Sequence, residues 1–362
     1  MDEHGDSILK GGKFPNVASS RKRGQKRQQD SIKIKLDNTN SILQIVQSLT
    51  PARRLWVGYS GGVDSHVLLD ILAKTFQHLP EFHVGALHVH HGISEHADDW
   101  VEHCEKVCSA LQVPLTVLMV DGKVREGRSP EEVAREARFQ AIEQFLAEDE
   151  ALVLAHHEED QAETILLRLF RGTGPYGLGG IPEKSKVGKG ELIRPFLKIS
   201  KEEILSYAKE HHLAWIEDES NHNTRFDRNF LRHEIMPVIA ARWPRVVRSV
   251  GRAGALCFET ATAVQVMAKQ DLECVKGKED TLSVSALLNL DLARRRGVIR
   301  YWLQGLGFAL PSRDHMERID REVLRAKPGS KPKLKISEYE IWREKDSLKV
   351  LDLVVSDSEV QL

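Results

Sequence analysis

Cysteine is scarce in this sequence of 362 residues. The four cysteines are Cys104, Cys108, Cys257 and Cys274, and no two of them have C-x-x-C spacing. Four thiols are too few for a disulfide scaffold in a chain of this length, and their spacing argues against a cysteine-bound metal or redox centre. Cys104 and Cys108 are four residues apart, so we expect them to share one face of a helix as small buried side chains.

Long apolar runs and a strong net charge are also missing. No run reaches the about 18 apolar residues of a membrane-spanning helix, and the N-terminus has no apolar signal core. The formal net charge of −1 argues against overall attraction to polyanions, although 29% of the residues are charged. The first 35 residues are polar and basic, which is typical of a disordered tail. From these absences we expect a cytoplasmic enzyme.

Four short apolar runs, at residues 55–59, 84–89, 115–120 and 152–155, recur about every thirty residues, with helical patterns between them. One helix has a clear expected start, with Ser129 as N-cap, Pro130 at the first helical position and Glu132 three residues after the cap. Strands that alternate with helices at this period predict βαβ units and a parallel sheet covered on both faces. The expected fold class is therefore α/β, with ligands at the carboxyl ends of the strands.

The remaining pattern divides the chain. We expect helices to begin near His66, near Asp160 and after Ser200, which forms a capping pair with Glu203. After about residue 238 the pattern changes to two or three helices between residues 242 and 306, then to short alternating segments at 333–336, 339–342 and 348–351. We predict a tail and lead-in helix over residues 1–50, a catalytic α/β domain over 51–238, and a smaller, mainly helical domain with short terminal strands over 239–362.

The segment Ser60-Gly61-Gly62-Val63-Asp64-Ser65 lies between the first strand and the helix that follows it. Its two glycines permit a close approach of the backbone to a ligand, and the N–H groups at a helix start favour an anion. Ser60 and Ser65 add hydroxyl donors. Asp64 would repel a bare phosphate, so its presence predicts a cation, most simply Mg²⁺, between the carboxylate and phosphate oxygens.

The hexapeptide is not a Walker A loop, because it has no lysine and lacks the G-x-x-x-x-G-K-[ST] spacing. Two glycines after a strand can form a plain tight turn, but the complete hexapeptide in a strand–turn–helix context favours phosphate binding. It resembles the PP-loop of the ATP pyrophosphatase superfamily. That resemblance implies cleavage of ATP between the α- and β-phosphates. AMP is transferred to a substrate oxygen, pyrophosphate leaves, and a second nucleophile then displaces AMP.

Three further segments narrow the choice within this superfamily. They are Leu87-His88-Val89-His90-His91-Gly92-Ile93, then residues 155–164 running on into Arg171-Gly172-Thr173-Gly174, and residues 216–221 followed by 227–232. In this order after the PP-loop they resemble the tRNA(Ile)-lysidine synthetase family, closely over residues 50–240 and more loosely beyond. The resemblance implies that ATP adenylates the C2 oxygen of the wobble cytidine in the CAU anticodon of an isoleucine tRNA. The amine of free lysine then attacks C2, which gives lysidine and releases AMP.

The resemblance also implies roles for individual side chains. Asp64, Asp160 and Arg228 are expected to be catalytic, with the two aspartates as Mg²⁺ ligands and the arginine stabilising the adenylated intermediate. Nucleotide contacts are expected from residues 60–65, His88, Gly172 and Gly174, and substrate contacts from His156, Glu163, Asn221 and Arg232. The family usually has two aspartates before the glutamine at position 161, whereas here the first of them is Glu159.

The residues alone leave structural alternatives open. Asp160 is at an expected helix start, where a carboxylate caps free N–H groups and suits the helix dipole. Arg228 and Arg232 are four residues apart on one expected helix face, which fits phosphate binding or ordinary surface ion pairs. The histidines at 88, 90 and 91 are expected to line a cleft rather than hold a transition metal. Residues 172–180 form either a lid over the nucleotide or a helix cap and a plain loop.

The C-terminal region contains a basic stretch, with twelve Lys or Arg and five Asp or Glu between residues 291 and 335. A local excess of cations fits contact with a phosphate backbone, and the resemblance implies that this domain binds tRNA. Trp302 and Phe308 are expected to be core residues rather than base-stacking platforms. Longer family members carry one more C-terminal domain, for which we expect this chain to be too short.

Three other functions have less support in the sequence. A PP-loop tRNA enzyme that inserts sulfur at a cytidine needs C-x-x-C pairs, and a PP-loop amidotransferase needs a glutaminase cysteine; neither is evident. A non-catalytic tRNA-binding protein would not need the intact PP-loop together with Asp160 and Arg228.

Overall fold

The first half of the chain folds around a six-stranded sheet. The computed structural model describes residues 36, 39–90, 92, 96–120, 130–327 and 329–353. The sheet has the order β3-β2-β1-β4-β6-β5, and only β5 and β6 pair antiparallel. Its strands are β1 Arg54–Gly58, β2 His83–His90, β3 Leu115–Met119, β4 Glu150–Val153, β5 Lys184–Val187 and β6 Gly190–Ile193. The expected α/β class and the four expected strands are confirmed, whereas the sequence did not predict the β5–β6 hairpin.

The order of the strands reverses next to β1. The chain runs from β1 through β2 to β3 on one side and then crosses to the other side of β1 to form β4. Val57 of β1 therefore lies opposite both Ala86 of β2 and Val153 of β4. In open α/β sheets such a switch point leaves a crevice outside the carboxyl ends of the strands, where ligands bind. The segments that follow β1 and β4 meet at this position.

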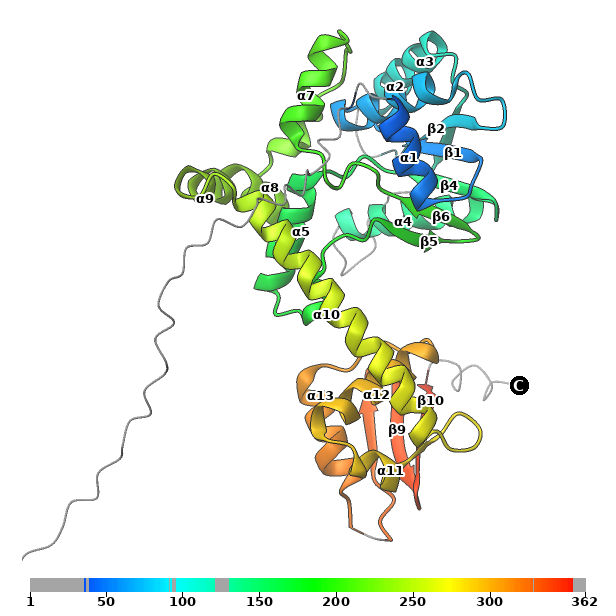
Figure 1. Cartoon of the computed structure of the whole chain (residues 1–362), viewed down its shortest axis with the longest axis vertical. Coiled ribbons are helices and arrows are strands. Elements are labelled where there is room, and N and C mark those ends of the chain that lie inside the picture. Colours follow the sequence, from blue (N-terminus) through cyan, green and yellow to red (C-terminus); the bar gives the residue numbers. More distant parts are fainter. Residues whose placement is uncertain are drawn as a thin grey trace, which may run out of the picture.

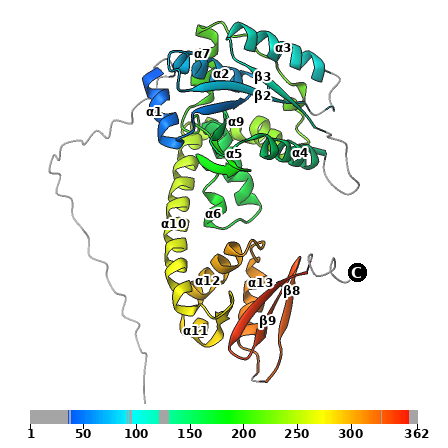
Figure 2. The ribbon, with the colours of Figure 1, turned by 90° about the vertical axis from the view of Figure 1, so that its right-hand side faces the viewer.

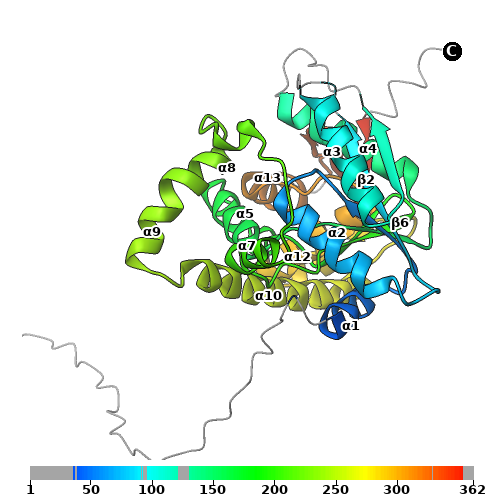
Figure 3. The ribbon, with the colours of Figure 1, turned by 90° about the horizontal axis from the view of Figure 1, so that it is seen from above.

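Helices cover both faces of the sheet, as expected (Figures 1 and 2). One face carries α1 Thr39–Leu49, α2 Val63–Phe76, α3 Ala97–Ala110 and α7 Lys201–Glu210. In the view from above, α2 and α3 lie over the strands (Figure 3). The other face carries α4 Pro130–Phe145, where Phe145 packs edge-on against Trp56 of β1 with 4.9 Å between ring centroids. α4 begins at Pro130 as predicted, and its expected N-cap, Ser129, lies outside the described residues.

The buried cysteines belong to the core under α3. Cys104 and Cys108 are free thiols with almost no exposed surface, which confirms that they pack as small apolar side chains. Burial raises the pKa of Cys104 to about 12, so this thiol stays protonated at physiological pH. α2 is enclosed in the same core between the sheet, α1 and α7, which explains why Val67, Leu68 and Leu72 are fully buried and why polar residues such as Asp70 are buried as well.

Two helices lie between β4 and β5, and further short helices and one long helix follow α7. They are α5 Glu158–Phe170, α6 Pro175–Leu178, the 3-10 turn η1 Glu219–His222, α8 Asp227–Phe230, the π-helical turn η2 Leu231–Ile235, α9 Met236–Arg242 and α10 Val246–Val275. α10 packs along α5 and α6 and then against α12, so a single helix joins the two halves of the molecule (Figure 1). The predicted boundary after residue 238 falls within α9, and the division into domains stays a prediction.

The C-terminal half packs helices on a four-stranded antiparallel sheet of order β7-β10-β9-β8. Its elements are β7 Leu282–Ser283, α11 Val284–Asn289, α12 Leu292–Gly305, α13 Arg313–Arg318, the π-helical turn η3 Ile319–Leu324, β8 Lys333–Ile336, β9 Tyr339–Glu344 and β10 Ser347–Asp352. The three strands expected here are confirmed. Trp302 is buried and donates its Nε1–H to the Asp280 carbonyl at 2.8 Å, as a core residue does. Within the described ranges, no helix is long and apolar enough to cross a membrane.

The contact of α10 with α5 depends on a glycine. A Cβ at Gly254 would lie 2.5 Å from Ile165 Cδ1 and 3.0 Å from the Leu178 carbonyl oxygen. We expect Gly254→Val to force the helices apart and lower the free energy of unfolding by about 1–3 kcal/mol. Gly251, one turn earlier, has nothing within 4 Å, so Gly251→Ala should stabilise the helix by about 0.5–1 kcal/mol. Urea denaturation compares the two variants, and equal stability would contradict close packing at Gly254.

Candidate functional site

The loop after β1 leaves the start of α2 open to an anion. α2 begins at Val63, three residues before the expected start near His66, and Gly62 precedes it without a side-chain cap. Gly61 has φ +84°, which glycine tolerates, and its carbonyl accepts the Ile216 N–H at 3.0 Å. Ser65 Oγ holds the turn closed, because it accepts the Ser60 N–H at 3.2 Å and donates to the Gly62 carbonyl at 3.0 Å. A rigid turn with uncapped helical N–H groups is an anion site.

The loop after β4 brings histidine and carboxylate groups to the start of α5. α5 begins at Glu158, two residues before the expected start at Asp160, and His157 is its N-cap residue. Asp160 Oδ2 accepts the His157 backbone N–H at 2.9 Å, so the capping role that the sequence left open is present. The His157 ring is buried among three carboxylates. Its Nδ1 is 3.0 Å from Glu159 Oε2, and its Nε2 is 3.4 Å from Asp160 Oδ2 and 3.8 Å from Asp64 Oδ2.

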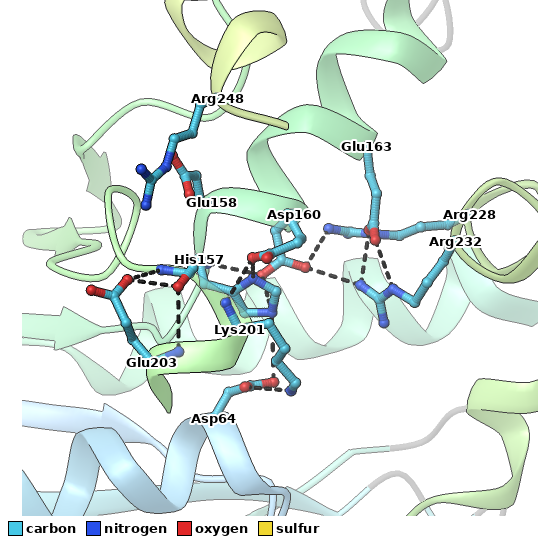
Figure 4. Close-up of polar contacts among 12 residues, drawn as sticks. Asp64, His157, Glu158, Asp160, Glu163, Lys201, Glu203, Arg228, Arg232 and Arg248 are labelled. Carbon is cyan, nitrogen blue, oxygen red and sulfur yellow. Dashed lines mark hydrogen bonds and ion pairs between the residues drawn. The ribbon is translucent and has the colours of Figure 1, made fainter. Parts of the chain in front are cut away.

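Asp64 links the PP-loop to α5 and α7 (Figure 4). Lys201, the first residue of α7, donates from Nζ to Asp64 Oδ1 at 2.5 Å. The backbone N–H of Lys201 also donates to Glu159 Oε2 at 2.9 Å. The side chains of Asp64 and Lys201 keep 31% and 34% of their surface exposed, so a ligand in the crevice can reach both.

Two arginines close the other side of the cluster (Figure 4). Arg228 donates from Nη2 to Asp160 Oδ1 and from Nε to Glu163 Oε2, both at 2.8 Å. Arg232 donates from Nε to Glu163 Oε1 at 2.7 Å and from Nη2 to Asp160 Oδ1 at 3.2 Å. The Glu163 side chain is only 3% exposed, whereas those of the arginines are 38% and 35% exposed, so Glu163 lies beneath the pair. The expected shared face of Arg228 and Arg232 is confirmed.

The charges of this cluster nearly balance. The carboxylates of Asp64, Glu159, Asp160 and Glu163 face the cations of Lys201, Arg228 and Arg232, with His157 between them. Burial opposes a charged imidazole, but the Glu159 hydrogen bond and the charges of Asp160 and Asp64 raise the pKa of His157 above its usual value. Burial would also raise the pKa of Asp160, yet the charges of His157 and Arg228 hold it below the usual value. The cluster therefore favours the ionised forms of Glu159 and Asp160 and the protonated form of His157.

The other expected site residues lie further out. His88 is buried, and its Nδ1–H donates to the Tyr59 carbonyl at 2.8 Å, directly before the PP-loop. His91 of the same motif lies outside the described residues. Asn221 is exposed on η1, where its carbonyl accepts from His233 Nε2 at 2.9 Å; among the described residues no hydrogen bond joins its side chain to the cluster.

Gly172 and Gly174 lie at the opposite end of α5 from Asp160. Gly172 has φ +71° where α5 ends, and Gly174 is the N-cap residue of α6. At 1.5 Å per helical residue, α5 separates Gly172 from Asp160 by roughly 15–20 Å. The segment packs on α10, with 6.0 Å between the rings of Tyr176 and Phe258. Gly172 therefore forms the helix cap that the sequence left open, whereas the segment after it contains the short helix α6 in place of a plain loop. The nucleotide contacts of Gly172 and Gly174 stay a prediction.

Three residues of the cluster, Glu159, His157 and Lys201, were not among the expected site residues, and Glu159 was noted only because it replaces an aspartate of the family. His157 is adjacent to the expected His156, and its extended backbone turns successive side chains to opposite sides. Lys201 is far from Asp64 in the sequence, and only its place after the Ser200 cap marks it. The capping pair itself is confirmed, since Ser200 Oγ accepts the Glu203 N–H at 3.3 Å and Glu203 accepts the Ser200 N–H at 2.9 Å.

The basic stretch of the C-terminal half is largely paired within the protein. Eight of its twelve cations have a carboxylate partner: Arg294, Arg295, Arg296, Arg313, Arg318, Arg321, Arg325 and Lys333. Arg300, Lys327, Lys331 and Lys335 have no such partner in the part of the chain that the structure describes. The net attraction for a phosphate backbone is therefore smaller than the count of basic residues predicts.

Comparisons with known proteins identify both halves of the chain. Residues 34–239 match the family model of a PP-loop domain, and residues 282–348 match the model described as the TilS substrate binding domain. The chain is 39% identical over 302 residues to the tRNA(Ile)-lysidine synthase of Coxiella burnetii, covering 83% of this chain and 67% of that protein. It is 40% identical over 317 residues to the same enzyme of Escherichia coli O157:H7, covering 88% and 73%. The Serratia proteamaculans enzyme is 37% identical over 327 residues, covering 90% and 75%.

Proposed function

The chain belongs to the tRNA(Ile)-lysidine synthase family, and from this premise we propose how its site joins free lysine to C2 of the wobble cytidine in the CAU anticodon of isoleucine tRNA. Family membership makes it an ATP-dependent ligase that acts on a tRNA. One observation carries the finer proposal: Asp64 of the PP-loop and Asp160 of α5 converge on His157 at the switch point of the sheet.

The first proposed step transfers AMP to the C2 oxygen of the cytosine. The carbonyl oxygen of the base is a poor leaving group until it carries a phosphoryl group. The uncapped start of α2 and the hydroxyl groups of Ser60 and Ser65 would hold the departing pyrophosphate. Arg228 is proposed to stabilise the charge that develops at the transferred phosphoryl group, because a guanidinium can donate two parallel hydrogen bonds to oxygens.

Asp64 and Asp160 suit a Mg²⁺ ion that arrives with ATP. Both carboxylates lie within 3.8 Å of His157 Nε2. Within the described ranges, however, no group of three His, Cys, Asp or Glu residues could hold a metal ion by itself. Two carboxylates without further protein ligands fit Mg²⁺, which takes its remaining oxygens from water and substrate phosphates. When bound, the ion would neutralise phosphate charge. Before the ion binds, Lys201 is the counter-ion of Asp64. His157 lies between the carboxylates of Asp64 and Asp160.

The second proposed step is the attack of the lysine amine on C2. That amine is protonated at neutral pH, with a pKa of about 8 for an α-amino group and about 10.4 for an ε-amino group, so it must lose a proton first. The carboxylate of Asp160 is proposed to accept the proton, and Glu163 to hold Arg228 and Arg232 in position beside it. The lowered pKa values of Glu159 and Asp160 support this, since they favour ionised carboxylates at neutral pH. The proton leaves with the product AMP or passes to solvent.

The C-terminal half is proposed to hold the tRNA while the anticodon reaches the crevice. Its match to the substrate binding domain supports this role. The proposed phosphate contacts are the four cations that have no carboxylate partner among the described residues, Arg300, Lys327, Lys331 and Lys335. We place the reaction in the cytoplasm, where tRNA, ATP and free lysine occur together. The chain spans between 67% and 75% of the length of the three relatives named above.

Lysine incorporation tests this proposal. The full chain is incubated with ATP, labelled lysine and isoleucine tRNA with a CAU anticodon, and methionine tRNA with the same anticodon is the control. We expect label in the isoleucine tRNA, with one AMP released per lysine incorporated. Absence of label despite AMP release would refute lysine as the nucleophile, and equal labelling of both tRNAs would refute the proposed substrate choice.

A further inference from the structure

Arg194 is a buried arginine with an unusual partner. It directly follows β6, and only 8% of the surface of this residue is exposed. Its Nη1 donates to the Pro182 carbonyl at 2.8 Å, and its Nε donates to His156 Nδ1 at 3.2 Å. Among the described residues it has no carboxylate partner, and burial lowers its pKa to about 10. Burying a cation without a carboxylate partner costs free energy. The groups to which Arg194 does donate therefore indicate why it is buried.

The Arg194 contact fixes where the proton of His156 sits. A guanidinium has donors only, so the imidazole nitrogen that it faces must offer a lone pair. His156 Nδ1 is therefore unprotonated, and the neutral ring carries its proton on Nε2. Burial lowers the pKa of His156 to about 4. The charge of Asp160 opposes this shift, and the charges of Arg194 and Arg228 add to it. The ring is a neutral Nε2–H donor at physiological pH.

In the part of the chain that the structure describes, the Nε2–H donor of His156 has no protein acceptor. Within the described ranges no hydrogen bond involves His156 Nε2, and this atom is not among the buried unpaired polar atoms, so it remains accessible. His156 follows β4 at the switch point, and its neighbour His157 is the one that binds the carboxylates of the cluster. The two adjacent histidines therefore have different partners: His157 faces the carboxylates of the cluster, and His156 faces the guanidinium of Arg194.

We propose that Arg194 is a positioning residue that fixes His156 as an Nε2–H donor. We further propose that this donor binds one of the oxygens that take part in the adenylation. The proposal rests on the proposed function. The acceptor is either the phosphoryl oxygen of the transferred AMP or the carbonyl oxygen of the base. A neutral imidazole suits both, because it stabilises developing negative charge on oxygen without attracting the carboxylates around it.

Nitrogen NMR of the full chain with ¹⁵N-labelled histidine tests the positioning role without ATP or tRNA. The His156 signals are assigned by their loss in His156→Gln. We expect an unprotonated Nδ1 and a protonated Nε2 in the wild-type chain, and a mixture of both tautomers in Arg194→Met. Arg168→Met is the matched control, because Arg168 likewise donates to backbone carbonyls, those of Gly177 and Gly180, but not to His156. A protonated Nδ1 in the wild-type chain, or an unchanged tautomer in Arg194→Met, would overturn the proposal.

A pair of substitutions tests the donor. The glutamine amide nitrogen reaches about as far as Nε2, and that of asparagine only about as far as Nδ1. We expect His156→Gln to keep tRNA-dependent AMP formation within about tenfold, and His156→Asn to lose about 10²-fold in kcat. A higher Kd for ATP in His156→Asn, measured without tRNA, would identify the phosphoryl oxygen as the acceptor. An unchanged Kd would identify the oxygen of the base. Equal activity of the two variants would overturn the donor role, whereas an inactive wild-type chain would contradict the proposed function and leave the NMR result to decide the positioning role.

Discussion

Asp64→Asn is expected to reduce AMP formation by roughly 10³-fold while tRNA binding persists. The substitution removes the charge that Lys201 and His157 hold in the crevice, and with it the proposed ligand of the cation on the phosphates. Loss of such a contact is worth several kcal/mol, and each 1.36 kcal/mol is about tenfold in rate. AMP release is measured by chromatography, and tRNA binding by filter retention at fixed salt.

Asp314→Asn is a matched control for this substitution. Asp314 is also an aspartate in the first turn of a helix, but it lies exposed on α13 in the C-terminal half. The same chemical change there should leave AMP formation within about twofold, as surface substitutions usually do. Turnover of Asp64→Asn at the rate of the control would refute the role of the carboxylate.

Arg228→Lys should lose about 10²-fold in AMP formation although the positive charge remains. Arg228 contacts Asp160 and Glu163 through two different nitrogens, and a single ammonium group cannot reproduce that geometry. The two proposed donors to the phosphoryl group would be reduced to one, and loss of one such donor typically costs about 10²–10³-fold.

Arg225→Lys separates this effect from a general change in charge. Arg225 is exposed three residues earlier in the same segment, and the Lys substitution there should leave the rate within about twofold. Thermal unfolding of both variants checks that the fold is intact. Wild-type activity of Arg228→Lys would show that only the charge matters.

The sheet was predictable because its four parallel strands are apolar runs with helical patterns between them. The strands that the sequence did not predict are short and lack that signal: β5 reads Lys-Ser-Lys-Val, and β7 has only two residues. The start of α2 was placed too late, near His66. Its first turn is polar, because Asp64 and Ser65 of the PP-loop are also the first residues of the helix.

The site was predictable where its residues share one short motif, and less so where long-range contacts build it. Asp160, Glu163, Arg228 and Arg232 form one network, as the motifs suggested. No local pattern could bring Lys201 to Asp64, because that contact depends on how α7 packs against α2. The sequence could not tell which of the two histidines after β4 faces the carboxylates, since that depends on the backbone conformation of a single residue.

ATP–pyrophosphate exchange in the absence of lysine tests the central claim most directly, because it shows which substrate receives the AMP. We propose that the PP-loop site adenylates the base before lysine attacks. Exchange of labelled pyrophosphate into ATP should therefore occur with isoleucine tRNA alone, and Asp64→Asn should abolish it. Exchange that needs lysine and proceeds without tRNA would mean that lysine is adenylated instead, and would contradict the account.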